Sequence, residues 1–250
     1  MDIYTEYTTT TAHNLSSALE ECLKLREGDP KFWAFRGQRH ATWDIGLHHD
    51  IASYNNLDTY FEQFQRRCME FPPHHHMEES NEWRWLFFAQ HHRLKTRLLD
   101  WTKDPLVAIY FAVENILSRQ EDQSECGAVW ALHVNDKHFK NPKDFKDIKD
   151  INAINDWILI NPPPFTPRIA RQSGLFSYHP DRDPASLNKI HLRKGEQLVK
   201  IKIEAKNGNN PTADIRKQLG ILNIHHGSLF PDPDGVAQFI NKEWANIGNI

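Results

Sequence analysis

The sequence predicts an α+β fold built as a single domain, and three observations support this prediction. Segments with helical spacing of apolar residues and segments with alternating or continuous apolar residues both occur along the 250-residue chain. They do not follow the strand–helix–strand rhythm that builds a parallel sheet. No internal repeat or low-complexity linker separates them. We therefore expect a small mixed or antiparallel sheet flanked by helices, with an N-terminal helical segment over residues 1–30.

The first half of the chain supplies most of the expected helices. Apolar spacing predicts helices over residues 16–26, 56–71 and 81–91. Short strands are expected at residues 32–36 and 96–101. Thr102 followed by Pro105 is a helix-start signal, in which the threonine caps the helix and the proline lies near its first position. A helix is therefore expected from Asp104 to about residue 119.

The second half is expected to supply the remaining strands and two helices. Strands are predicted at residues 127–134, 174–178 and 198–204. Helices are predicted at residues 214–222 and 236–244, the second after a turn at 231–235. The proline-rich segment 161–167 predicts an ordered loop or extended arm. The charged stretch 136–156 is helix-prone at best.

Composition and charge exclude several classes of protein. The net charge is −3, which gives no overall electrostatic reason to bind nucleic acid or membranes. The three cysteines are odd in number and form no CxxC pair, so neither a disulfide framework nor a zinc knuckle is supported. The polar N-terminus does not resemble a signal peptide, and no apolar run approaches the length of a membrane span. These features favour a cytoplasmic protein with reduced cysteines.

The most informative stretch is QHHRLKTRLLDWTKDPLVAIYFA at residues 90–112. It places histidines, arginines and an aspartate directly before an apolar helical pattern. Buried charges cost several kcal/mol unless they are paired, so a core segment of this composition would be expensive. The stretch therefore indicates a strand end and loop that face a ligand. The short element FRGQ at residues 35–38 is its expected partner.

Arg36 and Asp100 are the first candidates for this site. An arginine fork fits a pyrophosphate bidentately, and Gly37 would let the backbone approach that ligand. The alternative is a structural Arg36 paired with a buried carboxylate such as Asp100. Asp100 lies between apolar residues, so we expect it to pair with Arg36 or Arg97. It would hold that arginine or act as a base, and we favour the first role.

The histidines allow two interpretations. His91 and His92 are adjacent and point in different directions, so they form no chelating pair by themselves. Either could act as an acid, base or hydrogen-bond donor near neutral pH, and His92 is favoured because it lies nearer the loop. Further histidine clusters at residues 48–50, 74–76 and 225–226 raise the hypothesis of a metal site. None of them has the helical His–His spacing with a glutamate that a zincin needs, so no metal ligand is assigned.

These motifs resemble the FRG-domain family of bacteria and phages. The resemblance rests on FRGQ at residues 35–38, the run at 90–112, RQSGLF at 171–176 and LFPD at 229–232. It spans about residues 30–240 and places an FRG domain at 31–250. The family usually has glycine and proline where this chain has Arg93 and Lys95. This departure bears on the shape of the loop after His92.

A second resemblance is to ADP-ribosyltransferases of the arginine–serine–glutamate class. The order of motifs agrees: Phe35-Arg36-Gly37, a strand ending at Thr102, a helix with Ala108 and Phe111-Ala112, the apolar strand 127–134, and RQSG at 171–174. The chain departs from this class at Gln172, where the class has its catalytic glutamate.

This resemblance implies that NAD is the substrate and implies roles for residues around it. The residues expected to contact NAD are Arg36, Gly37, Gln38, His91, Arg97, Asp100, Trp101 and Arg171. The catalytic candidates are Arg36, His92, Thr102, Gln172 and Glu196. Thr102 would orient the nicotinamide ribose, or it is simply the helix cap. Gln172 can bond a ribose hydroxyl but cannot be a base, because it does not titrate. Glu196 could take the glutamate's place, or it is an exposed charge near a turn.

The function expected from these resemblances is that of an NAD-handling, ADP-ribosyltransferase-like effector or defence-associated toxin. It would transfer ADP-ribose to an unidentified acceptor, which is a protein or a nucleic acid. A regulatory or antitoxin partner is part of this expectation. The alternatives are a nucleotide-binding module without catalysis and a metal-dependent nuclease or hydrolase.

Overall fold

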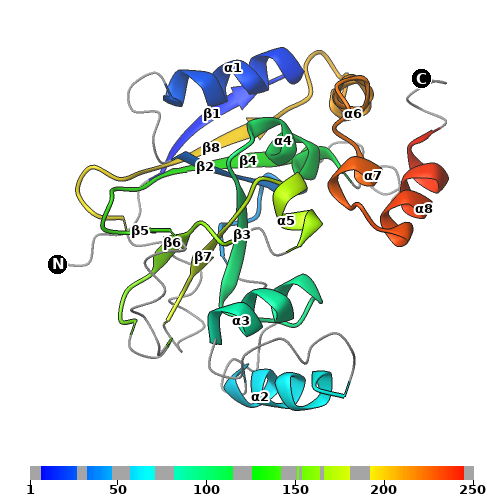
Figure 1. The fold of residues 1–250 in the computed structure, drawn as a ribbon. Coiled ribbons are helices and arrows are strands. Elements are labelled where there is room, and N and C mark those ends of the chain that lie inside the picture. The colour runs from blue at the N-terminus through cyan, green and yellow to red at the C-terminus, as the bar shows by residue number, and fades with distance from the viewer. Residues whose placement is uncertain are drawn as a thin grey trace.

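The structure is a computed structural model, and it describes residues 7–26, 33–46, 57–70, 82–114, 126–141, 151, 154–163, 166–180 and 192–244. A single eight-stranded sheet runs through it in the order β1-β8-β4-β2-β3-β7-β6-β5 (Figure 1). The strands are β1 (Thr8–Ala12), β2 (Trp33–Gln38), β3 (Leu98–Thr102), β4 (Ala128–His133), β5 (Phe139–Lys140), β6 (Ile158–Ile160), β7 (Gly174–Tyr178) and β8 (Gln197–Ile203). The helices are α1 (Leu15–Arg26), α2 (Leu57–Cys68), α3 (Glu82–His91), α4 (Pro105–Val113), α5 (Pro167–Arg171), α6 (Thr212–Ile221), α7 (His226–Leu229) and α8 (Pro233–Lys242). The predicted α+β class is confirmed.

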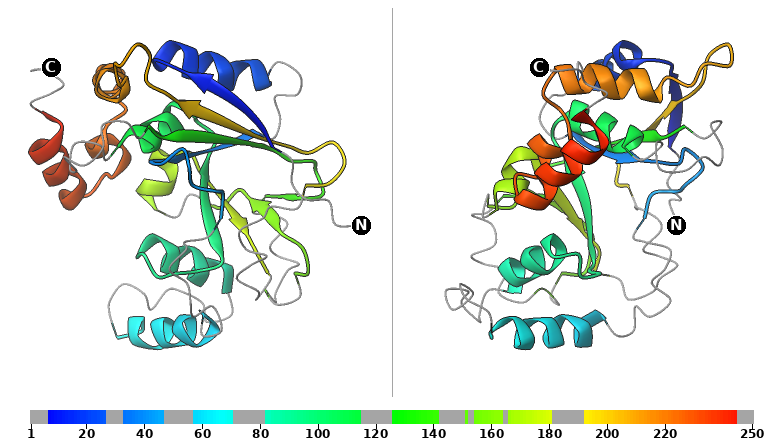
Figure 2. Two further views of the ribbon diagram at one scale, coloured as in Figure 1. Left: turned by 180° about the vertical axis from the view of Figure 1, so that it is seen from behind. Right: turned by 90° about the vertical axis from the view of Figure 1, so that its right-hand side faces the viewer.

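The sheet consists of two halves that meet at one residue pair. β2 pairs with β3 only through Phe35 and Thr102, whereas β2 pairs antiparallel with β4, and β3 with β7, along their lengths. β1 joins β8, and β5 joins β6, in parallel, so the sheet is mixed. Figures 1 and 2 show the two halves running at a steep angle to each other from this meeting point. A fork therefore opens between β2 and β3.

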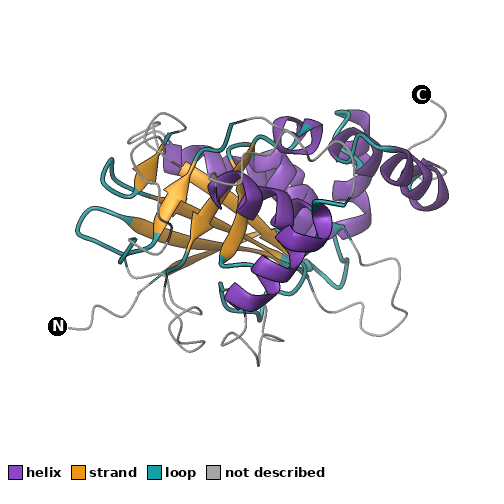
Figure 3. Ribbon diagram, turned by 60° about the horizontal axis from the view of Figure 1, so that its bottom comes forward, coloured by secondary structure: helices purple, strands orange, loops and turns teal. Residues whose placement is uncertain are grey.

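Three groups of buried apolar residues hold the halves and helices together. The outer face of the β1-β8-β4-β2 half packs against α1, α4 and α6, with Phe35, Ile109 and Ile201 among its buried residues. A second group, which includes Trp101 and Trp130, fills the space between the two halves. A third group, which includes Phe87, Phe176 and Tyr178, packs α3 against the other half of the sheet. Seen from below, the helices cluster at one end of the sheet (Figure 3).

The helix α4 lies unusually close to β2 because glycine faces it. A Cβ atom on Gly37 would lie 2.1 Å from the Ala108 carbonyl oxygen and 2.5 Å from the Ala112 nitrogen. A Cβ atom on Gly127, beside the start of β4, would lie 2.0 Å from the Ala112 carbonyl oxygen. Both obstacles are helix backbone, so only glycine fits at either position. Gly37, the glycine of FRGQ, therefore sets the distance between α4 and the sheet.

The start of α4 differs from the prediction. Asp104, not Thr102, caps the helix, and its carboxylate accepts a hydrogen bond of 2.9 Å from the Leu106 nitrogen. Thr102 instead ends β3, where its hydroxyl accepts a bond from the Asp104 nitrogen. Thr102 lies two residues before the actual cap, because β3 continues as far as Thr102. Residues 115–119 of the predicted helix lie outside the described residues.

Several elements were not expected from the sequence. β1, β5, β6, α5 and α7 had no predicted counterpart. The predicted turn at 231–235 is the first turn of α8, where Asp232 accepts a hydrogen bond of 2.7 Å from the Gly235 nitrogen. No helix in the described part of the chain is long and apolar enough to cross a membrane.

Candidate functional site

Arg36 bridges the fork between the two half-sheets. Its Nη1 donates a hydrogen bond of 2.7 Å to the backbone carbonyl of Asp100 on β3. Because β2 pairs with β3 only at Phe35, no backbone donor of β2 pairs with this carbonyl, and the arginine supplies one instead. The expected pairing of Arg36 with the Asp100 carboxylate is therefore wrong. Burial lowers the pKa of Arg36, and the nearby Asp100 opposes this shift.

The Asp100 carboxylate is exposed and is held by an amide. Gln90 Nε2 on α3 donates a hydrogen bond of 2.9 Å to Asp100 Oδ2. The Gln90 Oε1 in turn accepts a bond of 2.6 Å from the Thr96 hydroxyl, which fixes the orientation of the amide. The expectation that Asp100 is buried and pairs with Arg97 fails, because Arg97 binds Asp58 of α2 at 2.9 Å. The carboxylate is thus positioned but remains accessible.

Arg168 on α5 lies beside this carboxylate and was not among the predicted site residues. Its side chain is half-buried, and its guanidinium stacks over the Phe230 ring at 4.5 Å. No described residue forms a hydrogen bond or ion pair with that guanidinium. Burial lowers the pKa of Arg168, an effect that the Asp100 and Asp232 carboxylates partly offset. Sequence reasoning missed this residue, although Thr166-Pro167 before it is a helix-start signal of the kind that was recognised elsewhere.

Two hollows adjoin one another at His91. The smaller, with a volume of about 30 Å³, is lined by polar groups from three elements: Gln90, His91, Asp100, Arg168 and Gln172. The larger, about 460 Å³, lies between the end of α3 and α8 and is lined by His91, His92, Arg93, Asp234, Ala237, Gln238 and Asn241. Burial lowers the pKa of His91, and its neighbours His92 and Arg168 lower it further. We call the two hollows together the α3–α8 groove.

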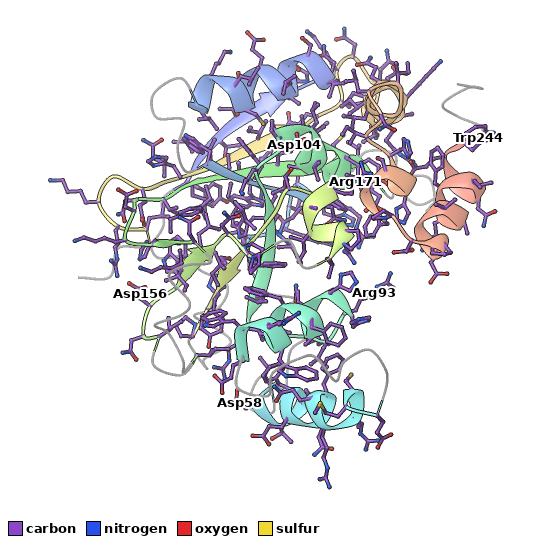
Figure 4. The ribbon with its side chains drawn as sticks, in the orientation of Figure 1. Asp58, Arg93, Asp104, Asp156, Arg171 and Trp244 are labelled. Carbon is purple, nitrogen blue, oxygen red and sulfur yellow. The ribbon has the colours of Figure 1, made fainter. Side chains whose placement is uncertain are left out.

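Arg93 occupies a backbone conformation that favours glycine. Its φ is +64°, and α3 ends there with hydrogen bonds from the Arg93 nitrogen to the Gln90 carbonyl and from the Leu94 nitrogen to the Ala89 carbonyl. This is the Schellman arrangement, in which glycine usually takes the left-handed position. The loop thus keeps the shape that glycine would give, with an arginine side chain at its turn. Figure 4 shows Arg93 at the end of α3 on the side of the molecule where α8 lies.

Thr102 and Gln172 are brought together, but their groups are largely committed to the fold. The Thr102 hydroxyl is buried and donates a hydrogen bond of 2.6 Å to the Gln172 carbonyl oxygen. Gln172 ends α5, and its Nε2 donates a bond of 3.1 Å to the Leu229 carbonyl oxygen. The Gln172 side chain still lines the smaller hollow. Thr102 therefore positions the α5–β7 turn.

Gly37, Gln38 and Trp101 have structural roles. Gly37 admits α4, not a ligand. Gln38 is buried; its Oε1 accepts a bond of 2.6 Å from Trp130 Nε1, and its Nε2 donates one of 3.2 Å to the Asp44 carbonyl. Trp101 donates from Nε1 to the Ser177 hydroxyl at 2.9 Å within the core, although it also borders the smaller hollow.

Three other candidates lie away from the smaller hollow. Glu196 is buried and accepts hydrogen bonds of 2.7 Å from His138 and 2.9 Å from the Arg193 nitrogen, so it is not an exposed charge. It lies four residues before Lys200, in the cross-strand row of Arg36, hence roughly 13 Å along the strand. Arg171 is exposed on α5 (Figure 4), and His92 lines only the larger hollow.

No group of three or more His, Cys, Asp or Glu residues is placed to hold a metal ion within the described residues. The histidine clusters at 48–50 and 74–76 lie outside them. His225 caps α7 through the Ser228 nitrogen, and His226 bonds Glu114 at 3.0 Å.

Comparison with known families finds a match for part of this chain. Residues 31–121 match the family model of the FRG domain. Over these residues the chain is similar to the FRG domain. The match includes the strand with Arg36, the amide and carboxylate of Gln90 and Asp100, and the helix α4. Arg168 and Gln172 complete the site from beyond the matched part of the chain. The chain matches no curated protein and no solved structure.

Proposed function

We propose that this FRG domain binds NAD, or a closely related dinucleotide, along the α3–α8 groove and transfers its ADP-ribose to an acceptor. The observation that carries the proposal is Arg168. Its half-buried guanidinium forms no hydrogen bond or ion pair with a described residue, and it lines the smaller hollow beside His91. An arginine fork of this kind fits a pyrophosphate bidentately.

The surroundings of Arg168 extend this anion site. His91 lines both hollows, and Arg93 lies at the end of α3, where the positive side chain faces the larger hollow. Arg168 and Arg93 thus flank the path from one hollow to the other. A pyrophosphate on this path would offset their charges and compensate for the burial of the Arg168 guanidinium.

The larger hollow suits the adenosine half of a dinucleotide. Gln238 and Asn241 of α8 line it. One side-chain amide can form two hydrogen bonds to the edge of an adenine ring. Its volume of about 460 Å³ is within the usual range of small-molecule sites. The smaller hollow, at about 30 Å³, admits only a single group such as a ribose hydroxyl. We therefore place the adenosine beside α8 and the reacting ribose over the smaller hollow.

Asp100 is the carboxylate that would act on the reacting ribose. It is the carboxylate in the lining of the smaller hollow, and Gln90 holds it in place. A fixed negative charge stabilises the positive charge that develops on the ribose as nicotinamide leaves. Gln172 would position a hydroxyl without titrating. Asp100 thus replaces Glu196, which lies at the other end of the sheet, as the candidate for this role.

As part of this proposal, the domain acts in the cytoplasm as an effector or defence-associated toxin. Unregulated use of NAD would harm the cell that makes it, so a regulatory or antitoxin partner belongs to the proposal. The acceptor is a protein or a nucleic acid. The second candidate function is a binding module that holds the dinucleotide without transfer. Gln172, which cannot titrate, and the small size of the hollow beside Asp100 favour it.

The test is release of nicotinamide from NAD by the purified protein, with and without cell lysate, measured by chromatography. Arg168→Gln should abolish release and NAD binding, and Asp100→Asn should abolish release while leaving binding within about threefold. Arg171→Gln is the matched control, because it removes an exposed arginine from the same helix. Binding without release would favour the module. Failure of NAD at millimolar concentration to bind, or equal losses in the Arg168 and Arg171 variants, would refute the site.

A further inference from the structure

A second pocket lies beside the N-terminal half of α3, whereas the groove adjoins the C-terminal end of that helix. It has a volume of about 270 Å³ and is bordered by α2, α3, the segment before β3, and β7. Its apolar lining residues are Leu57, Phe61, Leu86 and Ile151, and its polar ones include Asp58, Glu62, Glu82, Lys95, Arg97 and Tyr178. Figure 4 shows Asp58 at the start of α2, on the side of that helix that faces α3. Nothing in the dinucleotide proposal uses this pocket.

The hydroxyl of Tyr178 is the feature that calls for a ligand. The residue is 1% exposed, and no described group makes a hydrogen bond of normal geometry with the hydroxyl oxygen. The Arg97 guanidinium lies close enough to act as a donor to this oxygen and to lower the pKa of Tyr178, but it cannot accept the hydroxyl proton, and its Nη2 is bound to Asp58 at 2.9 Å. Burial raises the pKa of Tyr178, so its hydroxyl keeps its proton. What it lacks is an acceptor oxygen.

The charges around the pocket disfavour a carboxylate as that acceptor. Asp58 offsets Arg97, and Glu62 and Glu82 outnumber the remaining cation, Lys95. An anionic ligand would meet this surplus of negative charge. The same carboxylates can accept hydrogen bonds from an N–H group. A neutral ligand that presents a carbonyl oxygen beside an N–H group would therefore satisfy both kinds of partner.

We propose that this pocket binds a small planar carboxamide or lactam, with the carbonyl oxygen on the Tyr178 hydroxyl and the N–H edge toward the carboxylates of Glu62 or Glu82. The ring would lie between Phe61 and Leu86. The volume, about 270 Å³, is just below that of pockets for drug-sized ligands, which suits a single ring system. This pocket shares no lining residue with the proposed dinucleotide site.

The test compares three probes of one shape: benzamide, benzoate and benzylamine. Binding is measured on the full chain by saturation-transfer NMR and by thermal shift at millimolar concentrations. Benzamide should bind at least tenfold more tightly than either charged probe. Tyr178→Phe should weaken benzamide binding about five- to tenfold, the size of a hydrogen bond, with little change in stability, because the hydroxyl donates to no described acceptor. Arg168→Gln should leave benzamide binding unchanged.

Leu86→Trp, which fills the pocket, should abolish benzamide binding. If the Leu86→Trp variant does not fold, Tyr178→Phe still tests the site. Several results would overturn the proposal. These are no binding of benzamide, tighter binding of benzoate or benzylamine, or unchanged binding in Tyr178→Phe. Loss of benzamide binding in Arg168→Gln would assign the probe to the dinucleotide site instead. Because the two sites respond to different variants, either proposal can fail alone.

Discussion

Replacing Gly37 by alanine should destabilise the protein severely, although it adds a single methyl group. That carbon would lie 2.1, 2.5 and 2.8 Å from backbone atoms of Ala108, Ala112 and Phe111. A normal contact needs more than 3 Å, so α4 must retreat by about 1 Å. Overpacking in a core costs about 1–3 kcal/mol where side chains can adjust. Here the obstacle is helix backbone, so we expect a loss of about 3–5 kcal/mol from the free energy of unfolding.

The assay is urea unfolding, with Gly174→Ala as the matched control. Gly174 also lies in a strand of the sheet, but the nearest atom to its added carbon would be 3.5 Å away, an ordinary contact. The control should change stability by less than about 1 kcal/mol in either direction. With a slope of about 3 kcal/mol per molar urea, Gly37→Ala should lower the midpoint by 1 M or more. Equal midpoints for the two variants would refute the claim that Gly37 sets the position of α4.

Three smaller predictions test the termini of helices and a buried histidine. Asp104→Ala should cost about 1 kcal/mol, or roughly 2–4 °C in melting temperature, and Asp104→Asn should restore most of it because an amide oxygen still caps the Leu106 nitrogen. Arg93→Gly should raise stability by up to about 1 kcal/mol by thermal melting, because φ is +64° there, while Arg93→Ala should not. Burial lowers the pKa of His179 to about 4, so its stabilising contribution is complete above pH 6.5 and falls by about 3 kcal/mol as pH drops to 4. His179→Gln should remove this part of the pH dependence of unfolding, and an unchanged acid limb would contradict it.

The local patterns predicted most of the fold because they reflect burial. The helix at 16–26 and the strand at 127–134 appear as α1 and β4 within one or two residues, since their apolar spacing matches the faces that pack. β1 was missed because its residues, TTTTA, are polar and mostly exposed at the edge of the sheet. Its β-branched threonines were the available signal. β6 has three residues and α5 has five, which is too short for periodicity to show.

The candidate site was predicted in its neighbourhood but not in its details. The sequence placed FRGQ beside the 90–112 run, and Arg36 does meet Asp100, although at the carbonyl. The choice between carbonyl and carboxylate depends on where β2 stops pairing with β3, which no local pattern encodes. Arg168 was missed for a related reason. It reaches the site through the fold from about 70 residues along the chain, and without an alignment nothing marks it among the arginines of the sequence.

The four residues of FRGQ form a joint, and this changes how the site must be tested. Phe35 makes the one backbone pairing between the half-sheets, and Arg36 bridges the carbonyl that this pairing leaves open. Gly37 admits α4, and Gln38 fixes the loop after β2 through Trp130 and the Asp44 carbonyl. Loss of activity in an Arg36 variant would therefore follow from a separated fork as readily as from a lost ligand contact. A variant of Arg168 removes no hydrogen bond within the described fold, so it separates binding from architecture.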